Sequence, residues 1–202
     1  VLGETLITGI GQGYIQSTPL QLCMMTAQIA NGGFAIKPKI IVDSNPISYE
    51  DAKQAMESGL LFDTESEKLL DKKLFRNQKN IKIIQEAMFA STNERFGTSY
   101  KSRIDDPKYQ FAGKTGTAQV KRITEAEREL DRKLDQIPYK ERDHAWYIAF
   151  GPYKSPRYAM TVLIEHGGSG SSAAAPIAKK LFKKIIDRHE EREKIRNRKT
   201  LI

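Results

Sequence analysis

The sequence predicts an α+β domain in which an antiparallel sheet is flanked by helices. Three strand-like segments lie close together in the second half of the chain, at 110–120, 144–152 and 157–166. The short stretch GPYKSP joins the last two as a hairpin. An apolar stripe at helical spacing follows them: Ile177, Leu181, Phe182, Ile185 and Ile186. Antiparallel strands with a helix, here 174–189, across one face form an α+β layer, so the sheet is expected in this half.

The first half of the chain is predicted to be mainly helical. Thr18 is a suitable N-cap and Pro19 a suitable first residue for a helix that Gly32 and Gly33 end. Three short elements are expected next, an extended segment at 34–42 and helices at 49–57 and 64–70. The stretch NIKIIQEAMFAST then forms a helix with one face made of Ile81, Ile84, Met88 and Ser91. The polar run Ser91-Thr92-Asn93 is interpreted as a helix end.

Charge marks two segments that lie outside the predicted core. Residues 121–142 carry seven positive and six negative side chains among 22, which is typical of an exposed helical insertion with many ion pairs. The last 24 residues hold ten Lys/Arg and four Asp/Glu, so 10 − 4 = +6 of the net charge of +8 lies there. We therefore expect one domain at 1–189 with an insertion at 121–142, followed by a charged tail at 190–202.

Composition excludes several classes of site. The chain has 202 residues and one cysteine, Cys23, which rules out an internal disulfide and is expected to be a small buried apolar residue. There is no apolar run near the ~20 residues that a membrane span needs. The three histidines lack metal-ligand spacing, so neither a metal nor a cofactor is predicted. His144 is expected to pack on a strand and His166 to be a solvated loop residue.

The stretch FAGKTGTAQV, 111–120, places a cation and two hydroxyl groups on one predicted strand. Its Gly-Lys-Thr matches the end of a phosphate-binding Walker A motif. That motif also needs a glycine at position 108, where this chain has Lys108, and a helix after the lysine, where this chain favours a strand. A strand at a free sheet edge instead pairs with an extended peptide, and Gly116 permits close approach of another backbone. With Lys114, Thr115 and Thr117 as carboxylate ligands, the stretch is predicted to bind the carboxylate end of an extended peptide.

Several motifs resemble those of class B penicillin-binding proteins, and they occur in that family's order. The Lys-Thr-Gly of residues 114–116 is similar to the third signature of the penicillin-binding and serine β-lactamase group. The other matching stretches are GIGQGYIQSTPLQL, ANGG, FGTS, AGKTGTAQV, HAWYIAFGPY and EHGGSGSSAAAP. Together they span nearly the whole chain, from 9 to 186, and the charged insertion after GTAQV most resembles the elongation-type branch, penicillin-binding protein 2.

The resemblance implies the C-terminal part of the penicillin-binding transpeptidase or serine β-lactamase-like fold and peptidoglycan D,D-transpeptidation through an acyl-serine. It implies that Lys114 binds substrate and joins the proton network, that Thr115, Gly116 and Thr117 bind the substrate carboxylate end, and that the Thr117 backbone N–H stabilises the oxyanion. None of the serines has a lysine three residues later, so the S-x-x-K nucleophile is not in this chain. The expected partners therefore include a missing N-terminal part of the same protein, and the chain by itself is expected to be inactive.

The resemblance also implies peptidoglycan stem peptides and β-lactam antibiotics as ligands, and the cell-wall elongation machinery as a partner. It places the domain on the periplasmic side of the bacterial inner membrane, with the anchor outside this chain. Two alternatives stay open: a β-lactam-sensing receptor domain of the same fold, and a basic nucleic-acid-binding protein. Nucleic-acid binding favours aromatic residues among the basic ones, whereas the basic segment has only Phe182, so no nucleic-acid partner is expected.

Overall fold

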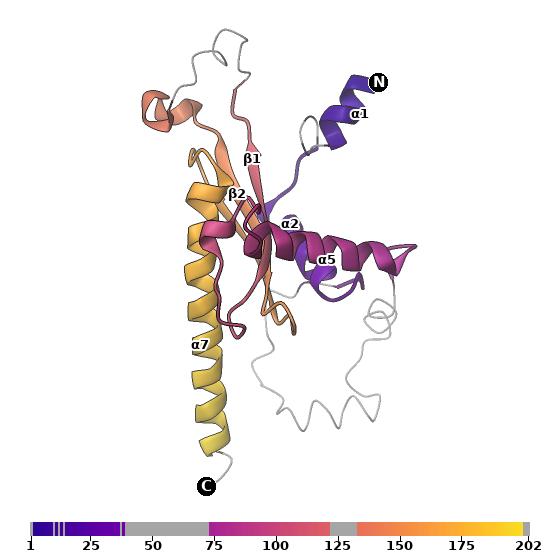
Figure 1. Ribbon diagram of the computed structural model, residues 1–202, viewed down its shortest axis with the longest axis vertical. Helices are drawn as coiled ribbons and strands as arrows, with labels where there is room; N and C mark the ends of the chain where they lie inside the picture. The colour runs from indigo at the N-terminus through magenta and orange to yellow at the C-terminus, as the bar shows by residue number, and fades with distance from the viewer. Residues whose placement is uncertain are drawn as a thin grey trace.

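A computed structural model describes residues 2–9, 11, 13, 15–36, 38, 73–121 and 133–199. The helices within these ranges are α1 (Leu2–Gly9), α2 (Pro19–Ala30), α5 (Gln78–Asn93) and α7 (Ala175–Lys199), and the strands are β1 (Ala112–Ala118), β2 (His144–Gly151) and β3 (Tyr158–Ile164). Single helical turns occur at Tyr100–Ser102, Leu134–Gln136, Tyr139–Glu141 and Gly170–Ala174. In Figure 1, α7 runs along one side of the sheet, α5 crosses it, and α1 lies apart from the rest.

The three strands form one antiparallel sheet in the order β1-β2-β3, which confirms the predicted α+β class. All three strand predictions are correct to within about three residues at each end. The GPYKSP stretch forms the predicted turn between β2 and β3. Within the described ranges, β1 pairs with β2 alone, so the strand that carries Lys-Thr-Gly lies at a sheet edge as predicted.

Each face of the sheet is covered by its own apolar core. On one face, alternate residues of β2, Ala145, Tyr147 and Ala149, pack against Ala178 and Phe182 of α7. On the other face, Ala112 and Phe150 pack against Ile29 of α2 and Met88 of α5. Because successive strand residues point to opposite faces, the alternation in β2 fixes which helices cover which side.

The helix α2 begins and ends for the reasons predicted, and α5 buries its predicted face. The Thr18 side chain accepts a hydrogen bond from the Gln21 backbone N–H, and the Gln21 side-chain oxygen accepts one from the Thr18 N–H, so the two residues form a capping box. After Ala30, Gly32 and Gly33 both have φ near +90°, a conformation that glycine adopts without strain. In α5, Ile81 and Met88 are buried, which confirms its predicted apolar face.

The buried stripe of α7 differs from the prediction. Its buried residues are Ala175, Ala178, Phe182 and Ile186, and Ala174 just before the helix is buried as well. Ile177 and Leu181 are 38% and 40% exposed, so they lie outside the stripe on a flank of the helix. Small residues fill this contact because the chain lies close against the sheet there: a methyl group on Gly170, in the turn before the helix, would overlap with the Trp146 carbonyl oxygen.

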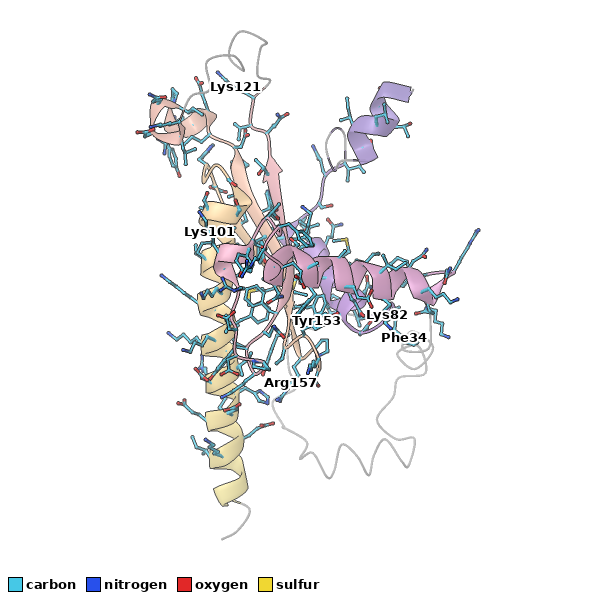
Figure 2. The ribbon with its side chains drawn as sticks, viewed as in Figure 1. Phe34, Lys82, Lys101, Lys121, Tyr153 and Arg157 are labelled. Atoms are coloured by element: carbon cyan, nitrogen blue, oxygen red, sulfur yellow. The ribbon has the colours of Figure 1, made fainter. Side chains whose placement is uncertain are left out.

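The helix α7 also continues to Lys199, beyond the predicted end at 189. Polar contacts hold its charged half to the domain on two sides. Lys108 Nζ lies 2.7 Å from Glu190 Oε2, and the Tyr109 hydroxyl donates to Asp187. At the β2–β3 turn, Arg157 lies 3.3 Å from Glu193 (Figure 2). These contacts tie residues 187–193 of the helix to the rest of the domain.

Several predicted segments lie wholly or partly outside the described residues. They are the extended segment at 34–42 beyond residue 38, the helices at 49–57 and 64–70, and residues 122–132 of the insertion. The described part of the insertion contains two 3₁₀ turns, Leu134–Gln136 and Tyr139–Glu141. Among the described helices, none is both long and apolar enough to cross a bilayer.

Candidate peptide-binding edge

The register of β1 separates its polar side chains. Lys114 pairs with Ile148, whereas Thr115 and Thr117 pair with Tyr147 and Ala145. Side chains of directly paired residues share a face, so Lys114 lies on the α2/α5 face and both threonines lie on the α7 face. The three functional groups can therefore meet a single ligand only around the outer edge of the strand.

Hydrogen bonds show which backbone groups of β1 face that edge. The Gly113 carbonyl accepts from Thr92 Oγ1 at 3.5 Å, and the Thr115 carbonyl accepts from Lys114 Nζ at 2.7 Å. Both carbonyls therefore point away from β2. In an antiparallel ladder the N–H and C=O of one residue point the same way and alternate along the strand. The backbone groups of Gly113, Thr115 and Thr117 are thus turned toward the outer edge.

Lys114 bends back over this edge. Its side chain is exposed, and its ammonium group donates to the neighbouring carbonyl rather than to an acidic side chain. An ammonium group has three N–H donors, so one such bond leaves capacity for an incoming carboxylate. The cation consequently lies beside the Thr115 backbone, where the carboxylate of an edge-paired peptide would arrive.

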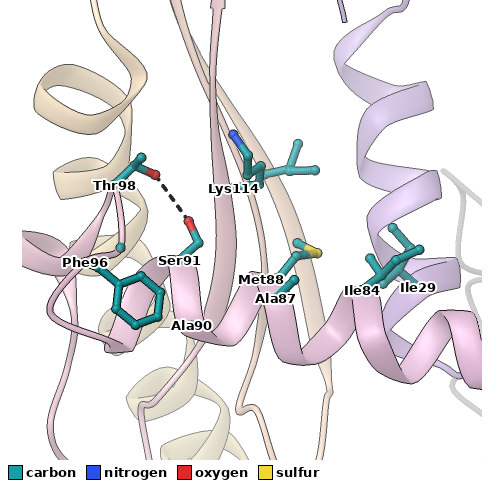
Figure 3. A pocket seen from close by; sticks show the side chains of 11 residues that line it. Ile29, Ile84, Ala87, Met88, Ala90, Ser91, Phe96, Thr98 and Lys114 are labelled. Atoms are coloured by element: carbon teal, nitrogen blue, oxygen red, sulfur yellow. Dashed lines mark hydrogen bonds between the residues drawn. The ribbon is translucent and has the colours of Figure 1, made fainter. Parts of the chain in front are cut away.

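Beside Lys114 lies an open apolar hollow of about 580 Å³. Figure 3 shows it between α5, α2 and the sheet, with Ile84 and Met88 below Lys114 and with Ser91 and Thr98 near Phe96. Phe96 is 82% exposed at its rim. The site therefore combines an apolar depression with one cation and a few hydroxyl groups, which suits a ligand with an apolar body and an anionic end.

Two hydroxyl networks next to β1 were missed by the sequence reasoning. An outer chain runs from Ser91 Oγ to Thr98 Oγ1, at 3.3 Å, and on to Thr115 Oγ1, at 3.2 Å. An inner cluster joins the Tyr147 hydroxyl to Thr92 Oγ1 at 2.9 Å and to Ser99 Oγ at 3.0 Å. The Ser91–Asn93 run does end α5 as predicted, but its side chains also connect that helix end to the candidate site.

The inner cluster is buried. Tyr147 and Thr92 are 0% exposed and Ser99 is 1% exposed. Burial raises the pKa of the Tyr147 phenol, so this hydroxyl keeps its proton and remains a donor. The Tyr147 ring runs directly under Gly113, where a methyl group would lie 2.5 Å from Cζ. Glycine is therefore required before Lys114.

A second backbone does lie close to Gly116, but it belongs to the same chain, and the glycine that permits this contact is Gly170, because a methyl group on Gly116 would meet Trp146 Cβ at 3.3 Å and no atom of Gly170. A methyl group on Gly170 would lie 2.6 Å from the Gly116 carbonyl oxygen. The turn at Gly170–Ala174 thus packs directly on the Lys-Thr-Gly strand. Whether Gly116 also admits a ligand backbone stays a prediction.

The prediction for His166 was wrong. Its backbone N–H donates to His144 Nδ1 at 2.9 Å, its ring lies 4.7 Å from the His144 ring, and Tyr139 packs on its ring at 4.9 Å. Both histidines are half-buried. Residues 139–144 are more than 20 positions before residue 166. No local sequence pattern therefore predicts that the turn at Tyr139–Glu141 packs against the loop that carries His166.

Cys23 is half-buried on α2, with Sγ 3.5 Å from the Ala159 carbonyl. Burial raises the pKa of its thiol, which disfavours the nucleophilic thiolate. In the part of the chain that the structure describes, no group of three or more His, Cys, Asp or Glu side chains is arranged to hold a metal ion.

Comparison with family models gives a match to the penicillin-binding protein transpeptidase domain over residues 1–183. The chain belongs to this family. Among curated proteins it is 33% identical, over 90% of its length, to the peptidoglycan D,D-transpeptidase MrdA of Haemophilus influenzae, and 32% identical to MrdA of Acinetobacter baumannii over 89%. The chain spans about a quarter of those relatives, 26% and 24% of their lengths.

Solved structures of transpeptidases agree with this assignment. The chain resembles penicillin-binding protein 2 of Helicobacter pylori, in a complex with MreC, with a TM-score of 0.66 and 32% identity, covering 93% of this chain and 28% of that one. It resembles Pseudomonas aeruginosa penicillin-binding protein 2, in complex with WCK 5153, with a TM-score of 0.59 and 32% identity, covering 89% and 31%. The predicted resemblance to the penicillin-binding protein 2 branch is confirmed.

Proposed function

We propose that this chain forms the Lys-Thr-Gly wall of a peptidoglycan D,D-transpeptidase site, which cross-links stem peptides through an acyl-serine intermediate. The observation that carries the proposal is the outer edge of β1, where Lys114, Thr115 and the backbone of Thr117 converge in a chain of the transpeptidase family. An edge strand binds an extended peptide by main-chain pairing, and the cation and hydroxyls at its edge suit the peptide's terminal carboxylate.

Each residue has a distinct role in this proposal. Lys114 attracts the carboxylate and takes part in the proton network around the nucleophile. The Thr115 and Thr117 hydroxyls donate to the carboxylate oxygens, and the Thr117 N–H, turned outward, stabilises the oxyanion of the tetrahedral intermediate. The nucleophilic serine belongs to residues outside these 202, because no S-x-x-K occurs in them.

The ligands and partners of the relatives extend the proposal. Mycobacterium tuberculosis penicillin-binding protein A, 25% identical to this chain, has been solved as a penicillin G acyl-enzyme complex, and the Helicobacter pylori protein as a complex with MreC. By analogy, we include β-lactams as ligands and the cell-wall elongation machinery as partner. The site then acts on the periplasmic side of the inner membrane, held there by an anchor outside this chain.

The test is acylation of the full-length protein by a fluorescent penicillin. Lys114→Ala should slow labelling by about 30- to 1,000-fold, the range expected for about 2–4 kcal/mol of lost electrostatic transition-state stabilisation. Lys82→Ala is the matched control, since Lys82 is an exposed α5 lysine whose only described ion pair is 3.9 Å long. Labelling of the Lys114 variant at the parent rate would refute the site assignment.

A further inference from the structure

Thr98 lies outside the Lys-Thr-Gly strand, but its hydroxyl is hydrogen-bonded to that of Thr115 on the strand, with the two oxygens 3.2 Å apart. The Thr98 hydroxyl is also 3.3 Å from the Ser91 hydroxyl, the contact that the dashed line in Figure 3 marks. The three oxygens thus form a chain that begins on α5, crosses the turn before Tyr100–Ser102 and ends on β1. From this chain we infer that Thr98 is a positioning residue, which orients the Thr115 hydroxyl as a hydrogen-bond donor toward the carboxylate of the substrate.

The direction of the hydrogen bonds follows from counting protons. A hydroxyl group has one proton to donate, and a carboxylate has none. When Thr115 donates to a bound carboxylate, its oxygen is left to accept from Thr98, and Thr98 in turn accepts from Ser91. A bound carboxylate therefore selects one of the two directions in which this chain can run, and each bond polarises the next.

The backbone on both sides of Thr98 is fixed. Before it, a methyl group on Gly97 would lie 2.5 Å from the Ala90 carbonyl, so the turn is pressed against the end of α5. After it, both the N–H and the hydroxyl of Ser99 donate to the Ser91 carbonyl, each at 3.0 Å, and Ser99 also bonds Tyr147. The backbone at Thr98 is thus held in place, and the hydrogen bonds of its hydroxyl to Ser91 and Thr115 select the side-chain rotamer.

The inference rests on the proposed function, because it assumes that Thr115 binds a carboxylate. The experiment compares acylation of the full-length protein by benzylpenicillin, which has a free carboxylate, and by its methyl ester, which does not. Thr98→Val keeps the shape of the side chain and removes the hydroxyl, whereas Thr98→Ser keeps the hydroxyl.

We expect Thr98→Val to slow acylation by benzylpenicillin about three- to tenfold, the value of one neutral hydrogen bond, and to leave the ester reaction unchanged. Thr98→Ser should restore the parent rate. If Thr98→Val slows both reactions equally, or neither, the positioning role is wrong. The proposed function is tested separately by measuring the same two acylation rates for Thr115→Val. If that variant also fails to distinguish acid from ester, the carboxylate site itself is wrong.

Discussion

Two glycines three residues apart on β1 should respond oppositely to the same substitution. Gly113→Ala would place a methyl group 2.5 Å from Cζ and 2.7 Å from Cε1 of Tyr147, a buried ring held by Thr92 and Ser99. In Gly116→Ala the nearest atom is Trp146 Cβ at 3.3 Å, which a small shift accommodates. The pair therefore separates steric overlap from the general effect of adding a side chain to the strand.

The magnitudes follow from the contacts. Overpacking against a rigid buried ring costs about 3 kcal/mol, the upper part of the usual range. Replacing glycine by alanine at an ordinary backbone conformation recovers about 0.4–1 kcal/mol through the unfolded state. Gly113→Ala should thus lower the free energy of unfolding by about 2 kcal/mol. Gly116→Ala should change it by less than about 1 kcal/mol.

Urea unfolding can be followed by the fluorescence of Trp146, the only tryptophan in the sequence. The 202-residue chain would be used at a concentration where sedimentation shows one species. The free energy of unfolding falls by about 2 kcal/mol per molar urea for a domain of this size, so Gly113→Ala should lower the unfolding midpoint by about 1 M. Equal midpoints for the two variants would show that the Tyr147 ring does not lie against Gly113, and the described packing behind Lys114 would be wrong.

Four further predictions concern other parts of the molecule. The 202-residue chain by itself should form no covalent adduct with a fluorescent penicillin on a denaturing gel, and a stoichiometric band would show that it contains the nucleophile. Because burial raises the pKa of Tyr147, the unfolded chain loses this proton first as pH rises above about 10, so stability should fall with pH there. Tyr147→Phe should flatten that fall, and an unchanged slope would exclude Tyr147 as a cause. Cys23 should react with iodoacetamide more slowly than a cysteine in a short peptide, since burial raises its thiol pKa, and equal rates would contradict its half-buried position. The chain should self-associate through the outer edge of β3 and the exposed Leu181, and Leu181→Lys should weaken this in sedimentation, whereas a parent chain that stays monomeric at all concentrations would refute it.

The sequence predicts best those features that depend on neighbouring residues. The cap at Thr18, the glycines after α2 and the strand predicted at 144–152 each follow from residues within a few positions. The edge position of β1 was also correct, because strand order in a meander follows chain order.

The errors concern packing between distant segments. The apolar residues of α7 are visible in the sequence, but only the sheet decides that Ala178 is buried while Leu181 stays exposed. Likewise Thr98 and Thr115 are 17 positions apart and Thr92 and Tyr147 are 55 apart, so no spacing rule joins them. Hydroxyl groups give little sequence signal, because serine and threonine also occur at helix ends and turns for local reasons.

The length of α7 also determines how far the end of this helix lies from the candidate site on β1. At 1.5 Å per residue, its 25 residues span about 37 Å, whereas a strand of seven or eight residues spans about 25 Å. The helix starts beside the sheet and, as Figure 1 shows, its last turns lie well past the sheet. The last turns of α7 therefore separate the end of the helix from the sheet, and a fluorescent protein or purification tag joined to the C-terminus should leave the peptide-binding edge of β1 unobstructed.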